Sequence, residues 1–445
     1  MNKEKQNSMS MTEGNILKIL LLFSVPIILG NLLQQLYNTV DSIIVGNYVG
    51  SNALAAVSSS TALINLLISF SQGISVGAGV IVSHSIGADD NKKIQLSVHT
   101  AIMISILFGA FLSIISFIFT PQLLQWMKTP NEIIPESVTY LRLFSLGMIF
   151  NIVYNMEAGI LNAVGNSKRS LLYLGIASVI NIILDLIFVK VLGMGVSGAA
   201  IATNISQLIS CVLAFRFLTK VSDVYKVYLN KIKLHKKTAE EIIKLGLPTG
   251  IQNMVIYLSN VLIQSAVNIF GTDTIAGFGA FLKVDGFNVL PVLSLGMAAT
   301  TFVGQNCGAR KKDRVKKGLL ITIIIGIIYA ASTGILLLTF SQPIMQLFTQ
   351  DKEIINIGIK AMKYFCPFYS LLAILQLLAG TIRGAGKTMP PMIILLFSLC
   401  IFRIIWIQFI LPLNNVIDSV YILYPVSWGI GTILIGIYTW KAKWL

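Results

Sequence analysis

Four acidic residues lie well inside long apolar segments of this chain, and they are its first candidates for chemistry: Asp41, Glu157, Asp185 and Asp285. An acid near the centre of a lipid bilayer costs about 2.5–3.5 kcal/mol on insertion scales, so such a residue is retained for a reason. Carboxyl groups at membrane depth bind and release protons or cations. We therefore expect ion-linked chemistry at some of these positions.

Polar side chains accompany two of these acids at helical spacing. Around Asp41 they are three and four residues apart, and so form one stripe: Gln34, Tyr37, Asn38 and Asp41. Asn181 and Asp185 are four apart and share a helical face. Asp41, Asp185, Tyr140 and Thr203 each lie five or six residues from the predicted outer end of their segment, which places them about 7–9 Å deep. The sequence therefore predicts one site built by four helices.

The composition makes the bilayer the solvent for these segments. Hydrophobic residues make up 55% of the chain and charged residues 11%, with a mean hydropathy of +0.80. The apolar runs are about 20 to 30 residues long and continuous, which predicts helices and excludes a barrel of short alternating strands. We predict an all-α membrane protein of twelve transmembrane helices. Their expected starts are near Asn15, Asn52, Lys93, Pro135, Arg169, Ser197, Ala239, Thr274, Val315, Asn356, Thr388 and Val416.

The chain also repeats itself. Ala158–Gly165 recurs as Ala379–Gly386, and Val82–Ala88 recurs as Val303–Ala309, both 221 residues further on. Repeated membrane units are how many transporters place a central site between two moving bodies. The predicted domains are an N-terminal six-helix lobe with the cation-coupling site (1–218), a cytoplasmic basic linker (219–238) and a C-terminal six-helix lobe (239–445).

The net charge is +15, and the Lys and Arg residues lie mainly on one side of the predicted spans. This distribution indicates membrane topology and argues against a nucleic-acid partner. With both ends on one side of twelve spans, that side carries 25 of the 33 Lys and Arg residues. Such asymmetry predicts a multi-pass protein of the cytoplasmic membrane with both termini and the linker in the cytoplasm. The linker is expected to form a short amphipathic helix on the membrane surface, and membrane lipids are expected partners.

No motif indicates an enzyme, a metal site or a nucleotide site. The four cysteines and three histidines have no metal-ligand spacing. Gly386-Lys387-Thr388 ends like a phosphate-binding loop, but Thr381 replaces the first glycine, so we interpret it as a tight turn. Uphill transport must then draw on an ion gradient.

At the polar stripes the chain resembles the multidrug and toxic compound extrusion (MATE) family, over nearly its whole length. The motifs are Gln34–Asp41 in the first helix and Asn181–Asp185 in the fifth. The resemblance implies a V-shaped pair of six-helix lobes that alternate between outward-open and inward-open forms. It implies that Asp41 is the cation-coupling acid, that Gln34 and Tyr37 line the drug cavity and that Pro26 is a hinge. The implied hydrogen-bond network of Asp41 consists of Asp185, Asn181, Thr203 and Tyr140.

One departure from the family bears on the coupling ion. The sodium-coupled branch carries acids within the seventh and tenth helices, where this chain is polar but uncharged. Protons are therefore the first expectation, with Na⁺ at Asp41 and Asp185 as the alternative. No other cofactor is expected.

Further residues are assigned to the substrate cavity: Asn38, Asn155, Glu157, Lys283 and Asp285. Lys283 and Asp285 point roughly 200° apart around their helix, so they cannot both face one cavity. They act either as a structural pair with other helices or as tuners of substrate charge. Arg403 is expected to partner a buried acid.

The predicted function is that of a secondary antiporter, working as a monomer. It would export amphipathic, often cationic, small molecules in exchange for H⁺ or Na⁺. The alternatives are a lipid-linked saccharide flippase of the same superfamily or, from another class, a membrane sensor or enzyme.

Overall fold

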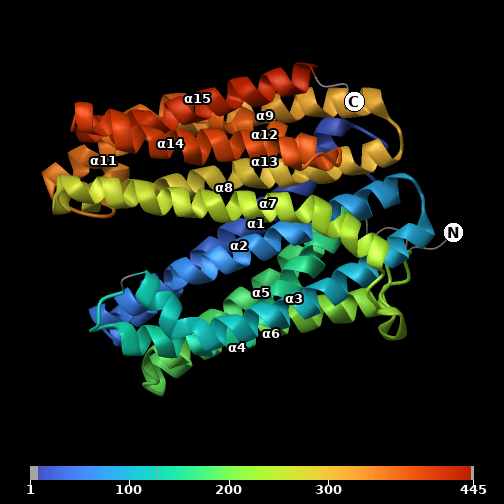
Figure 1. Cartoon of the computed structure of the whole chain (residues 1–445), viewed down its shortest axis with the longest axis horizontal. Helices are drawn as coiled ribbons and strands as arrows, with labels where there is room; N and C mark the ends of the chain where they lie inside the picture. Colours follow the sequence, from blue (N-terminus) through green and yellow to red (C-terminus); the bar gives the residue numbers. More distant parts are fainter. Residues whose placement is uncertain (1–8, 128, 442–445) are drawn as a thin grey trace. The chain divides into compact units, whose positions relative to one another are not determined.

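The computed structural model describes residues 9–127 and 129–441, which are almost entirely helical (Figure 1). Within them, twelve helical stretches are long and apolar enough to cross a membrane. In the first half they are α1 (Ile16–Tyr48), α2 (Ser51–Gly87), α3 (Asn91–Trp126), α4 (Ile134–Ala163), α5 (Ser167–Asp185) with its π-helical continuation Leu186–Val191, and α6 (Gly195–Lys220). In the second half they are α7 (Lys236–Val267), α8 (Thr272–Gly308), α9 (Lys312–Thr339), α11 (Lys352–Phe365) continuing into α12 (Tyr369–Gly384), α13 (Met389–Leu396) continuing through α14 (Phe402–Ile405), and α15 (Ile417–Lys441). The short α10 (Ser341–Gln346) precedes α11.

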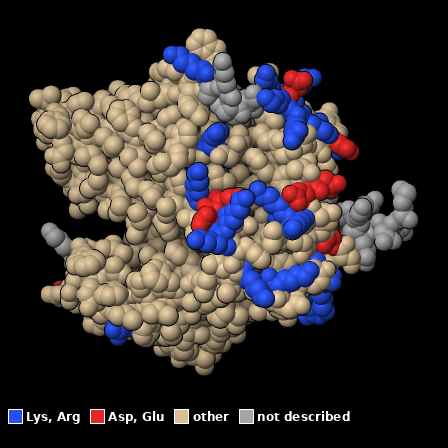
Figure 2. All heavy atoms as spheres, turned by 45° about the vertical axis from the view of Figure 1, so that its right-hand side comes forward, with Lys and Arg blue, Asp and Glu red and all other residues tan. Residues whose placement is uncertain are grey.

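These stretches confirm the predicted fold class, and each begins within four residues of its predicted start. Figure 2 shows broad areas of the surface in view that carry no charged side chain. Such areas suit contact with lipid, because burying a charge in hydrocarbon is costly whereas apolar side chains face it freely.

The chain forms two compact units, and two helices contribute to both. The first unit contains Val25–Gly250 and the described residues before Met11; the second contains Met11–Ser24 and the chain from Ile251 onward. The units therefore differ from the predicted halves: the start of α1 belongs to the second unit and the start of α7 to the first. Both changes fall beside an internal proline, Pro26 in α1 and Pro248 in α7. Proline lacks the N–H that would close the helical hydrogen bond, so each helix is weakest there.

The repeated motif that begins at Ala158 and Ala379 holds each unit together through a glycine. In the first unit α4 packs on α2, α3 and α6, and in the second α12 packs on α8, α9 and α15. A Cβ atom on Gly159 would lie 2.2 Å from the Ser75 hydroxyl oxygen, and one on Gly380 would lie 2.4 Å from the Gly296 carbonyl oxygen. Only glycine lets the helices approach this closely.

The same motif ends in a turn that also needs glycine. Gly165 and Gly386 have φ angles of 86° and 81°, in the left-handed region. Gly386 N–H donates to the Arg383 carbonyl at 2.9 Å, as Gly165 N–H donates to Asn162 at 2.9 Å. Gly386-Lys387-Thr388 is thus the turn after a helix.

The linker between α6 and α7 does not form the expected amphipathic helix, so that prediction was wrong. Its only regular element is a single 3₁₀ turn, Leu229–Lys231. Side chains of α3 form hydrogen bonds with its backbone instead. Tyr225, 1% exposed, anchors the linker in the core of the first unit. Burial raises the pKa of Tyr225 to about 12, so this anchor remains neutral at physiological pH.

The segment that leads into α1 is fixed to the second unit by side chains at the junction of α8 and α9. Met11, fully buried, donates its N–H to Gln305 at 3.0 Å and accepts from the Asn306 amide at 3.0 Å. Arg314 donates to the backbone carbonyls of Met11, Glu13 and Gly14 at 3.1, 2.8 and 2.8 Å. The repeated Val303–Ala309 motif therefore includes a docking place for Met11–Gly14.

Candidate functional site

Two buried carboxyl groups meet in the interior of the first unit. Asp41 on α1 is 8% exposed, Asp185 at the end of α5 is 0% exposed, and each acts electrostatically on the other. Asp41 Oδ1 and both carboxyl oxygens of Asp185 have no hydrogen-bond partner among the described residues. Two acids buried this way, without a basic partner, need a proton or a cation to neutralise them.

Two tyrosines complete the surroundings of this acid pair. Tyr140 on α4, 3% exposed, lies within electrostatic range of both Asp41 and Asp185. Tyr37, 6% exposed and one helical turn before Asp41, receives a hydrogen bond from the Gln207 amide at 3.3 Å. Phenol groups can donate to a carboxylate and accept from a carboxylic acid, so they suit a site whose charge changes.

Asn181 and Thr203 join the same region from α5 and α6. The Asn181 amide nitrogen lies 3.5 Å from the Thr203 hydroxyl, which donates to the Ala199 carbonyl at 3.0 Å. With its amide nitrogen engaged by Thr203, Asn181 presents an Oδ1 that is buried without a donor. The site thus contains acceptor oxygens on Asn181, Asp185 and Asp41 that receive no hydrogen bond from the described residues.

The other first-unit residues assigned to the substrate cavity lie in different surroundings. Gln34 is half-buried and Asn38 is exposed on α1. The Asn155 amide donates to the Asn151 side chain at 2.8 Å and to its carbonyl at 3.0 Å. Glu157 is 0% exposed, and neither of its carboxyl oxygens has a hydrogen-bond partner in the described part of the chain.

The second unit pairs its interior acid with a neutral group. Asp285 on α8 is half-buried and accepts a hydrogen bond from the Tyr369 hydroxyl of α12 at 2.7 Å. Lys283, two residues earlier, is exposed, so the two side chains lie in different surroundings as their helical spacing predicts. This hydrogen bond connects Asp285 of α8 to α12.

Among the described residues, Arg403 has no buried acid as its partner, so that expectation was wrong. The side chain is 3% exposed, its Nε donates to the Ser427 hydroxyl at 3.0 Å, and its guanidinium lies 4.6 Å from the centre of the Tyr424 ring. A planar guanidinium stacks well on an aromatic face, so the ring takes the place of a carboxylate.

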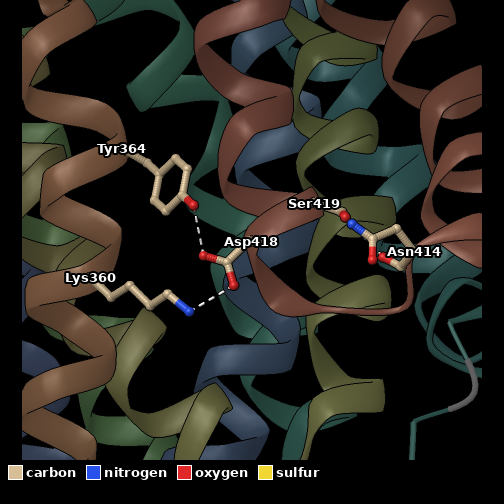
Figure 3. Close-up of polar contacts among 5 residues, drawn as sticks. All are labelled: Lys360, Tyr364, Asn414, Asp418 and Ser419. Carbon is tan, nitrogen blue, oxygen red and sulfur yellow. Dashed lines mark hydrogen bonds and ion pairs between the residues drawn. The ribbon is translucent and has the colours of Figure 1, made fainter.

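A further polar cluster, which the sequence did not reveal, ties α11 to α15 (Figure 3). The two oxygens of Asp418 accept from the Lys360 ammonium at 2.6 Å and from the Tyr364 hydroxyl at 2.7 Å. Beside it, the Ser419 hydroxyl donates to the Asn414 carbonyl at 2.9 Å. Asp418 and Lys360 are 58 positions apart, so no local spacing announces the pair.

Two residues that lie near the acid pair, Gln207 and Thr61, were also not predicted from the sequence. Gln207 is 3% exposed and lies four residues after Thr203, a helical spacing that would have placed both on one face of α6. Thr61 of α2 contacts Tyr140 through its side chain. Its neighbours in sequence are also small and polar, and nothing in them distinguishes Thr61.

A membrane protein with two repeated helical units, one of which holds an unsatisfied acid pair, has the architecture of a secondary transporter. The sequence model of the MatE family matches residues 26–187 and 248–407, which together cover most of the chain. The chain belongs to the MATE family and is a membrane transporter, not an enzyme.

Relatives and solved structures agree with this placement. The probable multidrug resistance protein YpnP of Bacillus subtilis is 32% identical over 88% of each chain, and YoeA of the same organism, also described as a probable multidrug resistance protein, is 30% identical over 95% of this chain and 94% of its own. An outward-facing MATE family transporter of the MOP superfamily superposes with a TM-score of 0.90, at 22% identity and 98% coverage of both chains. This structural likeness shows the fold.

Proposed function

We propose that the protein is a multidrug antiporter that exports amphipathic, often cationic, small molecules in exchange for an inward-moving ion. The observation that carries the proposal is the set of buried oxygens on Asp41, Asp185 and Asn181 that receive no hydrogen bond from any residue the structure describes. Its relatives are named as probable multidrug resistance proteins, which supports the substrate class.

The coupling ion is a proton in this proposal, with Na⁺ as the second candidate. A proton on either acid supplies a donor that the other acid or the Asn181 amide oxygen can accept. A sodium ion would take the same oxygens, with the Thr203 hydroxyl as a further neutral ligand. Asp41 and Asp185 thus carry the ion, while Asn181, Thr203 and Tyr140 form its hydrogen-bond network.

In this proposal, alternating access depends on bending of α1 at Pro26. Pro26 lies where α1 passes from the second unit to the first, two residues after Ser24. We infer that α1 bends there when the charge of Asp41 changes, because bending at a proline breaks no further hydrogen bond. This bending moves the stripe of Gln34, Tyr37 and Asn38, which lies on the same helix, relative to the bound substrate.

The remaining assignments complete the proposal. Substrate also contacts Asn155, Glu157, Lys283 and Asp285 during the cycle. The protein acts as a monomer among membrane lipids of the cytoplasmic membrane, with both termini in the cytoplasm.

Proteoliposomes loaded with a fluorescent amphipathic cation test the coupling. An imposed pH gradient should drive its movement and a sodium gradient should not. Asp41→Asn keeps the volume but cannot titrate, so it should reduce gradient-driven movement to the rate of empty liposomes. Asp273→Asn, an acid at the first turn of α8, is the matched control and should transport normally. Normal pH-driven transport by Asp41→Asn would refute the assignment.

A further inference from the structure

A cavity of about 270 Å³ lies between the first turns of α3 and the end of the linker, within the first unit. Its polar lining comes from Gln95 and His99 of α3 and from Asn230, Lys231, Lys233 and His235 of the linker. None of the lining residues is acidic. The cavity is separate from the acid pair and has no part in the proposed coupling.

The walls of this cavity are held by specific hydrogen bonds. The Gln95 amide donates to the carbonyls of Val224 and Lys226, the latter at 3.1 Å. His99, 2% exposed, donates from Nδ1 to the Gln95 carbonyl at 2.6 Å and accepts the Tyr228 N–H at Nε2, at 2.9 Å. Both ring nitrogens are thereby committed, which fixes the tautomer. The linker is thus held against α3 in one conformation despite its lack of helix.

The cavity carries positive charge that nothing in its walls neutralises. In the part of the chain that the structure describes, the ion pairs are Lys93–Glu241 and Lys360–Asp418, and neither includes Lys231 or Lys233. The Lys231 ammonium lies 4.6 Å from the centre of the Tyr228 ring, which itself stacks on His99. The contact between Lys231 and Tyr228 positions one cation at the cavity, and Lys233 and the amide of Asn230 also lie in its lining. Such a set of donors suits a phosphate group.

Exposed apolar side chains on the same stretch of linker indicate that the ligand has an apolar part beside its phosphate. Leu229 is 70% exposed and Leu234 is 50% exposed, on either side of the two lysines. Exposed leucines that alternate with lysines favour an interface between water and hydrocarbon. Anionic lipids attract basic segments beside spanning helices, and α3 begins at Asn91, four residues before Gln95.

We propose that this cavity binds the phosphate headgroup of an anionic phospholipid. Lys231 and Lys233 hold the phosphate, Asn230 orients it, and Leu229 and Leu234 contact the acyl chains, while Gln95 holds the linker backbone that carries the lysines. The bound lipid fastens the linker, and with it the start of α7, to the membrane surface. The site goes beyond the proposed antiport and does not depend on which ion drives it.

Native mass spectrometry of the purified full-length protein in neutral detergent tests the site, with short-chain phosphatidylglycerol as the probe and phosphatidylcholine as the uncharged comparison. The double variant Lys231→Gln/Lys233→Gln should weaken phosphatidylglycerol binding at least about tenfold and leave phosphatidylcholine unchanged. The control Lys236→Gln/Lys237→Gln removes the same charge from exposed positions just outside the cavity and should bind normally. Equal binding by both double variants would overturn the proposal.

A second arm separates a lipid from free phosphate. Inorganic phosphate should compete weakly, and Leu229→Ser/Leu234→Ser should weaken phosphatidylglycerol binding but not phosphate binding. Inorganic phosphate that binds as tightly as the lipid, with the same lysine dependence, would overturn the lipid assignment. No gradient is applied here, so the outcome is independent of whether the protein proves to be an antiporter.

Discussion

The position that holds Asp185 in the first unit holds Trp406 in the second, 221 residues further on, and Asn181 corresponds to Phe402. The backbone at these positions is nevertheless alike: a π-helical segment follows Asp185 as Leu186–Val191 and another begins at Trp406 as Trp406–Ile410. The Trp406 indole donates to the Ser419 carbonyl at 2.9 Å. Both units thus keep an irregular helix that commonly marks functional sites, and only the first keeps the titratable group there.

The acids of the two units also differ in their partners. In the second unit, Asp285 is bonded to Tyr369, and Asp418 to Lys360 and Tyr364. In the first, neither carboxyl oxygen of Asp185 has a hydrogen-bond partner within the described residues, and its charged neighbour is another acid, Asp41. An acid that is already satisfied gains little from binding an ion, whereas an unsatisfied buried acid gains a great deal. The comparison therefore favours the first unit as the place of the proposed ion exchange.

The largest expected effect tests this division directly. Asp185→Asn should reduce the rate of substrate-induced proton movement at least about tenfold, because the amide cannot take up and release a proton as the carboxyl group does. Asp285→Asn keeps a hydrogen-bonding group opposite Tyr369 and should change mainly substrate preference or folding. Stopped-flow pH measurements on proteoliposomes distinguish the two. If Asp285→Asn removed the proton signal and Asp185→Asn preserved it, the division between the units would be refuted.

Sequence patterns predicted the parts of this molecule that depend on local periodicity. The apolar runs gave twelve helices because a span must satisfy its own backbone, and the spacing of three and four placed Tyr37 with Asp41. The partners of Arg403 and Asp418 were not predictable, because Tyr424, Lys360 and Tyr364 become neighbours only through packing of distant helices. The prediction of an amphipathic helix in the linker was wrong for a related reason. The basic and apolar residues of the linker suit a surface helix, but Gln95 and His99 form hydrogen bonds with its backbone instead.

A second prediction uses the repeated glycines to compare the two scaffolds. Gly380→Ala would place a Cβ against the Gly296 backbone, which cannot move without shifting α8, and should cost about 1–3 kcal/mol of stability. Gly159→Ala meets the Ser75 hydroxyl, which can swing aside by giving up its hydrogen bond to the Asn155 carbonyl, at about 0.5–1.5 kcal/mol. Thermal unfolding of the purified variants in detergent should therefore show the larger drop in Tm for Gly380→Ala. An equal drop would mean that the helix contacts of the two units are equivalent.

The smallest expected effect concerns another pair of repeat counterparts, Arg314 and Lys93, which lie 221 residues apart. Arg314 donates to three backbone carbonyls of Met11–Gly14, whereas Lys93 makes one ion pair with Glu241 at 3.1 Å, with 45% and 38% of the two side chains exposed. Hydrogen bonds from a charged donor to backbone stabilise more than an exposed ion pair, which contributes roughly 0–1 kcal/mol. Arg314→Gln should therefore raise hydrogen–deuterium exchange in the peptide covering Met11–Gly14 by about tenfold. Lys93→Gln should change exchange at the start of α7 by less than about fivefold. The reverse order would show that the segment entering α7 is clamped more tightly than the one entering α1, and that the contrast between the units does not extend to these helix ends.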